Sequence, residues 1–155
     1  GMYAHIHGNL FTQLQGLKLL DSLLNEEFSG LTGRRLDEVA TLEFSIHELM
    51  RQLFVERRKL GKVMNGIRVS QYAEMLPEEQ RLEIMDLVRQ LDKTEQKCAR
   101  QSSLNAELVF GLLDQGQQLL DFMHSRIVPP KAGLYGTKGE VLHPRPEAAV
   151  ISGRL

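Results

Sequence analysis

The 155-residue sequence has one cysteine, no tryptophan and few aromatic residues, which together make up 6% of the chain. The single thiol, Cys98, excludes an internal disulfide and any zinc site built from several thiolates. Leu, Glu, Gln, Lys and Arg abound instead, and this composition favours helices over a β-sandwich or barrel. We therefore predict an all-α protein in a reducing, cytoplasmic location.

The sequence also lacks an excess of either charge and any long apolar run. Lys and Arg number 19 against 20 for Asp and Glu, for a formal net charge of −1. A protein that contacts many phosphates would normally be basic, so nucleic-acid binding is not expected. No apolar run approaches the ~18 residues of a membrane span, and no secretory signal is recognisable. We expect no direct insertion into a membrane.

Leucine-rich heptads predict three long helices, at about residues 9–29, 36–64 and 77–127. Asn9 is a suitable N-cap for the first, because its side chain can accept a hydrogen bond from an unpaired backbone N–H. The third begins at Pro77, which suits the first helical position. Residues 65–76 form a connector with a short turn near its end.

The third helix would span about 50 residues, or ~75 Å. Its seam is apolar at both ends but polar in the middle, so the helix is either continuous or broken near residues 95–105. The segments of about 20, 28 and 50 residues do not match in length. Part of the third helix should therefore lack a partner within the chain.

These segments predict an elongated antiparallel bundle or coiled coil of three to four long helices in residues 1–128. Residues 129–155 hold four of the five prolines and should form an extended Pro/Gly-rich tail. Within the third helix, residues 104–127 are apolar on more than one face, yet they contain Gly111 and Gly116. Two interpretations stay open: this stretch adapts to a partner helix, or it fills the protein's own core or a dimer seam.

No residue pattern indicates catalysis. His5 and His7 have no neighbouring Cys or carboxylate, and His47 has no second His at the spacing of a metalloprotease helix. The glycines from Gly133 onward do not match a phosphate-binding loop, because no helix follows them. We predict that the protein is not an enzyme and holds no cofactor or metal.

Three short runs carry a family resemblance: residues 104–108, residues 117–120 and the Leu-Tyr-Gly-Thr-Lys-Gly element at residues 134–139. In this order, they resemble the C-terminal half of the FlgN-type flagellar export chaperones. One departure is Ala106, where the family often has Gly. The resemblance implies a cytoplasmic type III export chaperone, which binds the C-terminal assembly segment of hook–filament junction proteins and prevents their premature polymerisation.

The resemblance also implies partners and site residues. The partners would be the hook-associated (hook–filament junction) proteins and the cytoplasmic domain of the flagellar export gate, with the export ATPase as a further candidate. Tyr135, Gly136 and Gly139 would dock on the gate. The cargo-binding residues would be Leu104, Asn105, Leu108, Val109, Leu112, Leu113, Gln117, Leu119, Leu120 and Met123. The alternative hypothesis is a structural coiled-coil homodimer or adaptor without export cargo.

Overall fold

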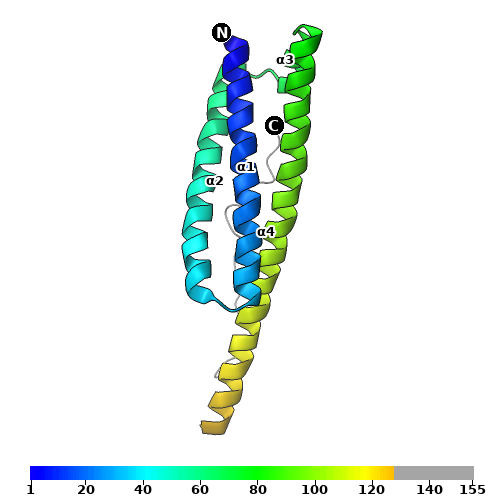
Figure 1. Ribbon diagram of the computed structural model, residues 1–155. Helices are drawn as coiled ribbons and strands as arrows, with labels where there is room; N and C mark the ends of the chain where they lie inside the picture. Colours follow the sequence, from blue (N-terminus) through cyan, green and yellow to red (C-terminus); the bar gives the residue numbers. More distant parts are fainter. Residues whose placement is uncertain (128–155) are drawn as a thin grey trace.

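The computed structural model describes residues 1–127, which form four helices: α1 (Met2–Thr32), α2 (Leu36–Met64), α3 (Val69–Glu74) and α4 (Glu78–Ile127) (Figure 1). No β-strand occurs among these residues, and the all-α prediction is confirmed. None of the helices in this part of the chain has the length and apolar character needed to cross a membrane. The predicted tail at residues 129–155 lies outside the described residues.

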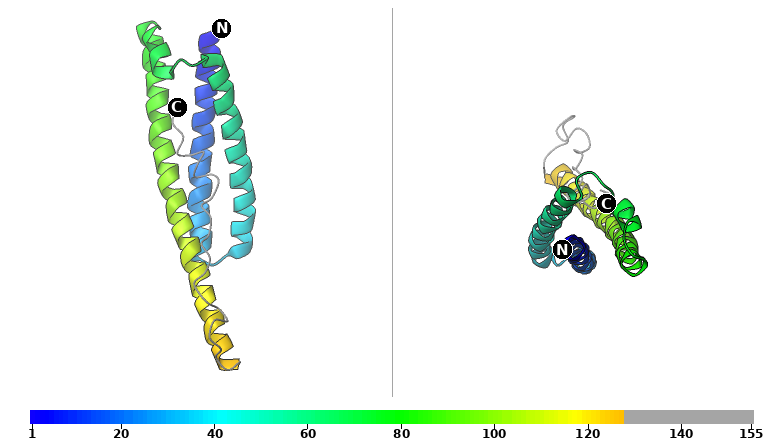
Figure 2. Two further views of the ribbon diagram at one scale, coloured as in Figure 1. Left: turned by 180° about the vertical axis from the view of Figure 1, so that it is seen from behind. Right: turned by 90° about the horizontal axis from the view of Figure 1, so that it is seen from above.

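α1 is the central helix, with α2 packed on one side and α4 on the other (Figure 2). α1 and α4 run in the same direction, and α2 runs opposite to both. Hydrogen bonds confirm this register, because they join residues 81 positions apart at two levels: the Cys98 thiol donates to the Leu17 carbonyl, and the Asn105 amide to the Leu24 carbonyl. Consecutive long helices are thus antiparallel, as predicted, while the α1–α4 pair is parallel.

α1 begins seven residues earlier than the predicted start. Asn9 is therefore not an N-cap; it lies in the third turn of the helix. Its side-chain amide donates to the Glu56 carbonyl at 2.9 Å, and its side-chain oxygen accepts from Gln13 at 2.7 Å. This buried polar side chain links α1 to α2, and no proline between Met2 and Asn9 prevents the helix from starting early.

The core consists of the heptad leucines of α1 and the apolar faces of the helices around it. Gly16 allows α1 and α2 to approach closely, since a Cβ atom at that position would lie 2.7 Å from Leu53 Cδ2. The fully buried aliphatic residues are Ile6, Leu10, Leu20, Leu24, Ile46, Ile84 and Leu91. These residues belong to α1, α2 and α4, so one continuous core joins the three long helices.

α4 is one continuous helix of 50 residues, which resolves the choice between a continuous and a broken helix. The polar residues in the middle of α4 are buried and hydrogen-bonded, so they do not weaken the packing of the helix there. Glu95 accepts from Arg57 of α2 at 2.9 Å. The Asn105 amide donates to the Leu24 carbonyl at 2.9 Å and to the Glu27 carboxylate at 2.7 Å. Because these buried groups have partners and no Gly or Pro occurs between Glu78 and Phe110, nothing interrupts the helix.

The two halves of α4 should differ sharply in their contribution to stability. Leu91 is fully buried and Leu119 is 57% exposed, although both belong to the same heptad series. We expect Leu91→Ala to lower the free energy of unfolding by about 2–5 kcal/mol, because it leaves a cavity. Leu119→Ala should change it by less than about 0.5 kcal/mol. Urea denaturation followed by circular dichroism checks both values, and equal losses would contradict this division.

Candidate partner-binding surface on the free end of α4

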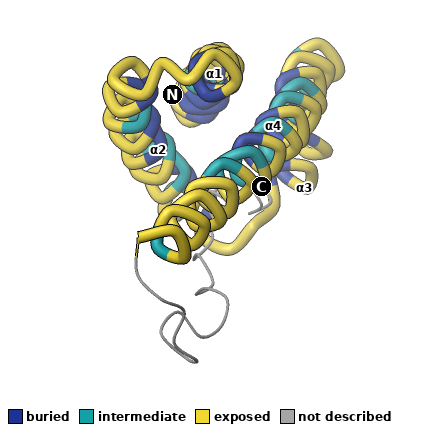
Figure 3. Tube along the Cα trace, turned by 90° about the horizontal axis from the view of Figure 1, so that it is seen from below, coloured by how far each residue is buried: buried dark blue, intermediate teal, exposed yellow. Residues whose placement is uncertain are grey.

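Burial along α4 stops abruptly at Asn105. The buried residues of this helix all lie between Ile84 and Asn105. None of the residues that follow, 106–127, is buried, and Figure 3 shows this part of the helix in the colours of exposed and intermediate residues. The cause is the end of α1 at Thr32, after which the chain turns into α2. We call residues 106–127 the α4 extension; at 1.5 Å per residue it is ~33 Å long.

The α4 extension exposes an unusual amount of apolar surface. Five of its large side chains, Leu113, Leu119, Leu120, Phe122 and Met123, are each between 47% and 57% exposed, and Ile127 is 76% exposed. Leu104, just before the extension, is 49% exposed. Single exposed leucines are ordinary, but a contiguous cluster of this kind is typical of an interaction site. The prediction that part of this helix lacks a partner within the chain therefore agrees with the structure over residues 1–127.

One narrow stripe of the extension is polar. Glu107, Asp114 and Asp121 recur every seven residues, and such spacing places side chains on one face of a helix. Two glutamines reinforce the stripe, since Gln118 donates to Asp114 and Gln117 donates to Asp121, both at 3.0 Å. The apolar residues occupy the remaining, wider face. The extension is thus an amphipathic helix with no apolar partner among the described residues.

The residues predicted to bind cargo divide into three groups by their position. Asn105 is fully buried and belongs to the α1–α4 contact. Leu108, Val109 and Leu112 are half-buried at the root of the extension. The exposed group comprises Leu104, Leu113, Gln117, Leu119, Leu120 and Met123. Their binding role stays a prediction. The predicted gate-docking residues Tyr135, Gly136 and Gly139 lie outside the described residues.

The predicted cargo-binding residues do not include two aromatic residues of the apolar stretch 104–127 or one arginine that contacts it. Phe110 and Phe122 are 39% and 54% exposed, and their helical spacing from the predicted leucines was a signal that could have identified them. Arg34 lies in the turn after α1, and its guanidinium donates to the Gln115 side chain at 3.3 Å. No sequence pattern connects residues 81 positions apart, so only the fold reveals this contact.

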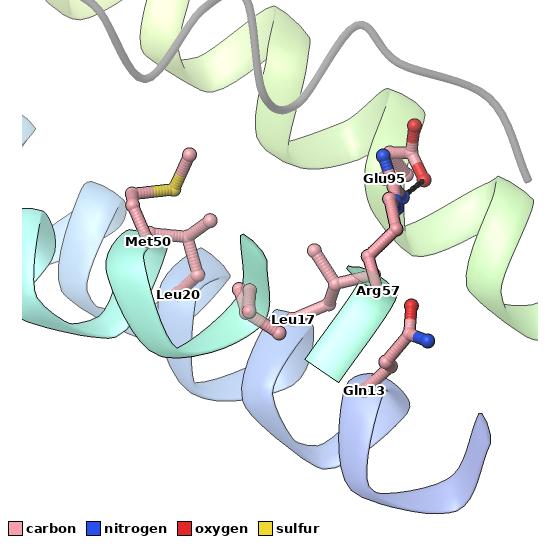
Figure 4. Close-up of a pocket in the computed structure, with 7 residues that line it drawn as sticks. Gln13, Leu17, Leu20, Met50, Arg57 and Glu95 are labelled. Carbon is pink, nitrogen blue, oxygen red and sulfur yellow. Dashed lines mark hydrogen bonds and ion pairs between the residues drawn. The ribbon is translucent and has the colours of Figure 1, made fainter. Parts of the chain in front are cut away.

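The bundle has two open surface pockets, one of about 310 Å³ lined by residues of α1 and α2 and one of about 300 Å³ lined by residues of α1 and α4. A small cavity between α2 and α4 has Leu17 and Leu20 as its floor and Met50 in its wall (Figure 4). The Arg57–Glu95 ion pair bridges it, and its volume of about 20 Å³ suits about one water molecule. Across residues 1–127, no group of three or more His, Cys, Asp or Glu side chains could hold a metal ion.

The reactivity of the Cys98 thiol measures how tightly α1 and α4 are packed. Burial, with the nearby Asp21 carboxylate as a smaller cause, raises the pKa of the Cys98 thiol to about 12. Only the thiolate reacts readily with alkylating reagents. At pH 8 we expect native Cys98 to react at least about a thousandfold more slowly than an unperturbed thiol, and to react rapidly in urea. Timed iodoacetamide labelling with mass spectrometry checks this, and fast labelling of the folded protein would show that α1 and α4 separate readily.

Comparisons with known proteins bear on this surface. Residues 2–143 match the family model described as FlgN protein. Searches of curated proteins and of solved structures found no match. The matched range includes all four helices and therefore the whole α4 extension.

Proposed function

The chain belongs to the FlgN family of flagellar export chaperones, and from this premise we propose that the α4 extension captures the C-terminal assembly segment of hook–filament junction proteins. The protein would act in the cytoplasm, keep these segments from polymerising, and deliver them to the export gate. We assign it no catalytic step and no cofactor.

The observation that carries this proposal is the exposed apolar face of the α4 extension. Assembly segments that form amphipathic helices associate with one another through their apolar faces unless something covers them. A helix with an uncovered apolar face can cover such a segment by side-to-side packing. Leu113, Leu119 and Leu120, each more than half exposed, supply large contacts without any rearrangement of the bundle core.

The same geometry supports release of the cargo. A single helix offers a narrow binding surface, while the core residues of α1, α2 and α4 stay buried whether cargo is bound or not. A cargo segment that folds on binding also loses conformational entropy, which lowers its affinity for a given contact area. Capture and release would therefore involve the extension and leave the bundle folded.

The proposed delivery step rests on the residues after α4. By resemblance to the family, Tyr135, together with Gly136 and Gly139, would dock on the cytoplasmic domain of the export gate. The export ATPase is a further candidate partner. In this arrangement cargo binding and gate docking belong to different segments of the chain, and a variant can therefore lose one while it keeps the other.

The exposed seam also favours a second candidate, a homodimer in which the extensions of two copies cover each other. Light scattering separates the candidates. A stable dimer without affinity for junction-protein segments would support the structural role, and a monomer that forms a complex with such a segment would support the chaperone.

We expect Leu112→Asp combined with Leu119→Asp to abolish cargo capture. Burying one leucine contributes about 1.5–3 kcal/mol, so the loss of two should weaken binding more than a hundredfold. The matched control is Gln118→Asp with Ser125→Asp, which adds the same charge to the same helix but on its polar stripe. Isothermal calorimetry with C-terminal segments of hook-associated proteins measures both. Equal binding by the two variants would contradict the proposed surface.

Tyr135→Ala should leave cargo capture unchanged and block export, because Tyr135 lies outside the α4 extension. Tyr135→Phe serves as the control that retains the ring. Affinity for cargo is measured by calorimetry, and export by the amount of hook-associated protein in the culture medium. Normal export by Tyr135→Ala would refute the docking role.

A further inference from the structure

The interface between α1 and α4 continues beyond the end of α1. On α4 one heptad series, Leu91, Cys98, Asn105, Leu112 and Leu119, faces α1 as far as Asn105, where each member is fully buried. The next members of the series, Leu112 and Leu119, become progressively exposed. α1 packs on this series in parallel orientation. The extension therefore presents the same kind of surface that α1 already occupies, and a helix in line with α1 would continue the contact.

Gly116 marks where such a helix would begin to pack. It belongs to the companion series that includes Glu95 and Ser102, which are both buried. A Cβ atom at Gly116 would meet no atom within 4 Å, so packing within the described residues does not require glycine there. A glycine within a helix is less favourable than an alanine. It does allow the backbone of a second helix to approach closely.

Arg34 provides a positive charge at the same level of α4. Its guanidinium contacts Gln115, the residue before Gly116. Arg34 is exposed and makes no ion pair with any residue between Gly1 and Ile127. It adopts a left-handed backbone conformation with φ 56°, which is unfavourable for residues other than glycine. The neighbouring Arg35, by contrast, is paired with Glu38 at 2.8 Å.

The helix dipole favours one direction for the incoming helix. The C-terminal end of α1 carries partial negative charge, and its last turn holds no basic residue. An incoming helix in the α1 direction would place its positive N-terminal end beside it. Acidic side chains are common in the first turn of a helix, as Asp37 and Glu38 of α2 illustrate. Such a carboxylate would lie next to the turn that holds Arg34.

We propose that the bound cargo helix continues the line of α1, parallel to α4, with its N-terminal turn over Gly116 and a carboxylate of that turn paired with Arg34. This inference rests on the proposed capture of cargo by the α4 extension and adds its direction, its register and one specificity residue. Arg34 would thus distinguish a helix with an acidic first turn from other amphipathic helices.

Arg34→Gly tests the charge without harming the fold, because glycine accepts the left-handed conformation at no steric cost. We expect roughly threefold weaker binding of hook-associated C-terminal segments by Arg34→Gly, and roughly tenfold weaker binding by Arg34→Glu. Arg34→Lys should bind nearly as the wild type does. Replacing the first-turn carboxylate of the segment by its amide should remove the difference between wild type and Arg34→Gly. Unchanged binding by Arg34→Glu would overturn the proposal.

A cross-linking experiment tests the proposed direction of the bound cargo helix. A benzophenone side chain in place of Thr32, the last residue of α1, should cross-link to the N-terminal end of the bound segment. Cross-linking to its C-terminal end would overturn the proposed direction. A segment that fails to bind the wild type refutes the proposed function itself, whereas binding that ignores Arg34 refutes only this inference. If Arg34→Gly weakens self-association instead of capture, a second copy occupies the position and the proposal is wrong.

Discussion

The structure depends on two helices of unequal length that share one seam. α1 has 31 residues and α4 has 50, and they pack in parallel from the same end of the bundle. When α1 ends, the apolar face of α4 continues without a partner among residues 1–127. The mismatch therefore creates two parts within residues 1–127: a closed core that supplies stability, and an exposed apolar helix on which the proposed binding rests.

Polar groups in the seam hold these parts in register. The Asn105 amide bonds to the Leu24 carbonyl and the Glu27 carboxylate at the last buried level of α4. A one-heptad slip of α4 along α1 would separate the Asn105 amide from the Glu27 carboxylate, and a buried polar group without a partner costs about 1–3 kcal/mol. Apolar side chains alone would tolerate such a slip more easily. The polar middle thus determines where the extension begins, which links a packing detail to the proposed chaperone function.

Most of the helices could be predicted from heptad spacing and from the residues that end helices. α2 has the predicted bounds, Leu36 to Met64, because Gly33 and the Asn65–Gly66 pair surround a strong periodic pattern. The predicted start of α1 is wrong, since no proline between Met2 and Asn9 stops the helix and the Asn9 side chain bonds to α2 rather than capping α1. The sequence leaves open whether the third helix is continuous, because it does not reveal the hydrogen-bond partners of the polar residues in its middle.

Local pattern was enough to establish an all-α chain with an apolar third helix longer than its partners, because periodicity and helix length are properties of a single segment. Local pattern was not enough to establish the packing direction, since a heptad specifies which face of a helix is covered but not the direction of the helix that covers it. The burial of Asn105, the exposure of Phe122 and the contact of Arg34 with Gln115 all follow from the parallel register of α1 and α4. They depend on contacts between distant residues, which form only when the chain has folded.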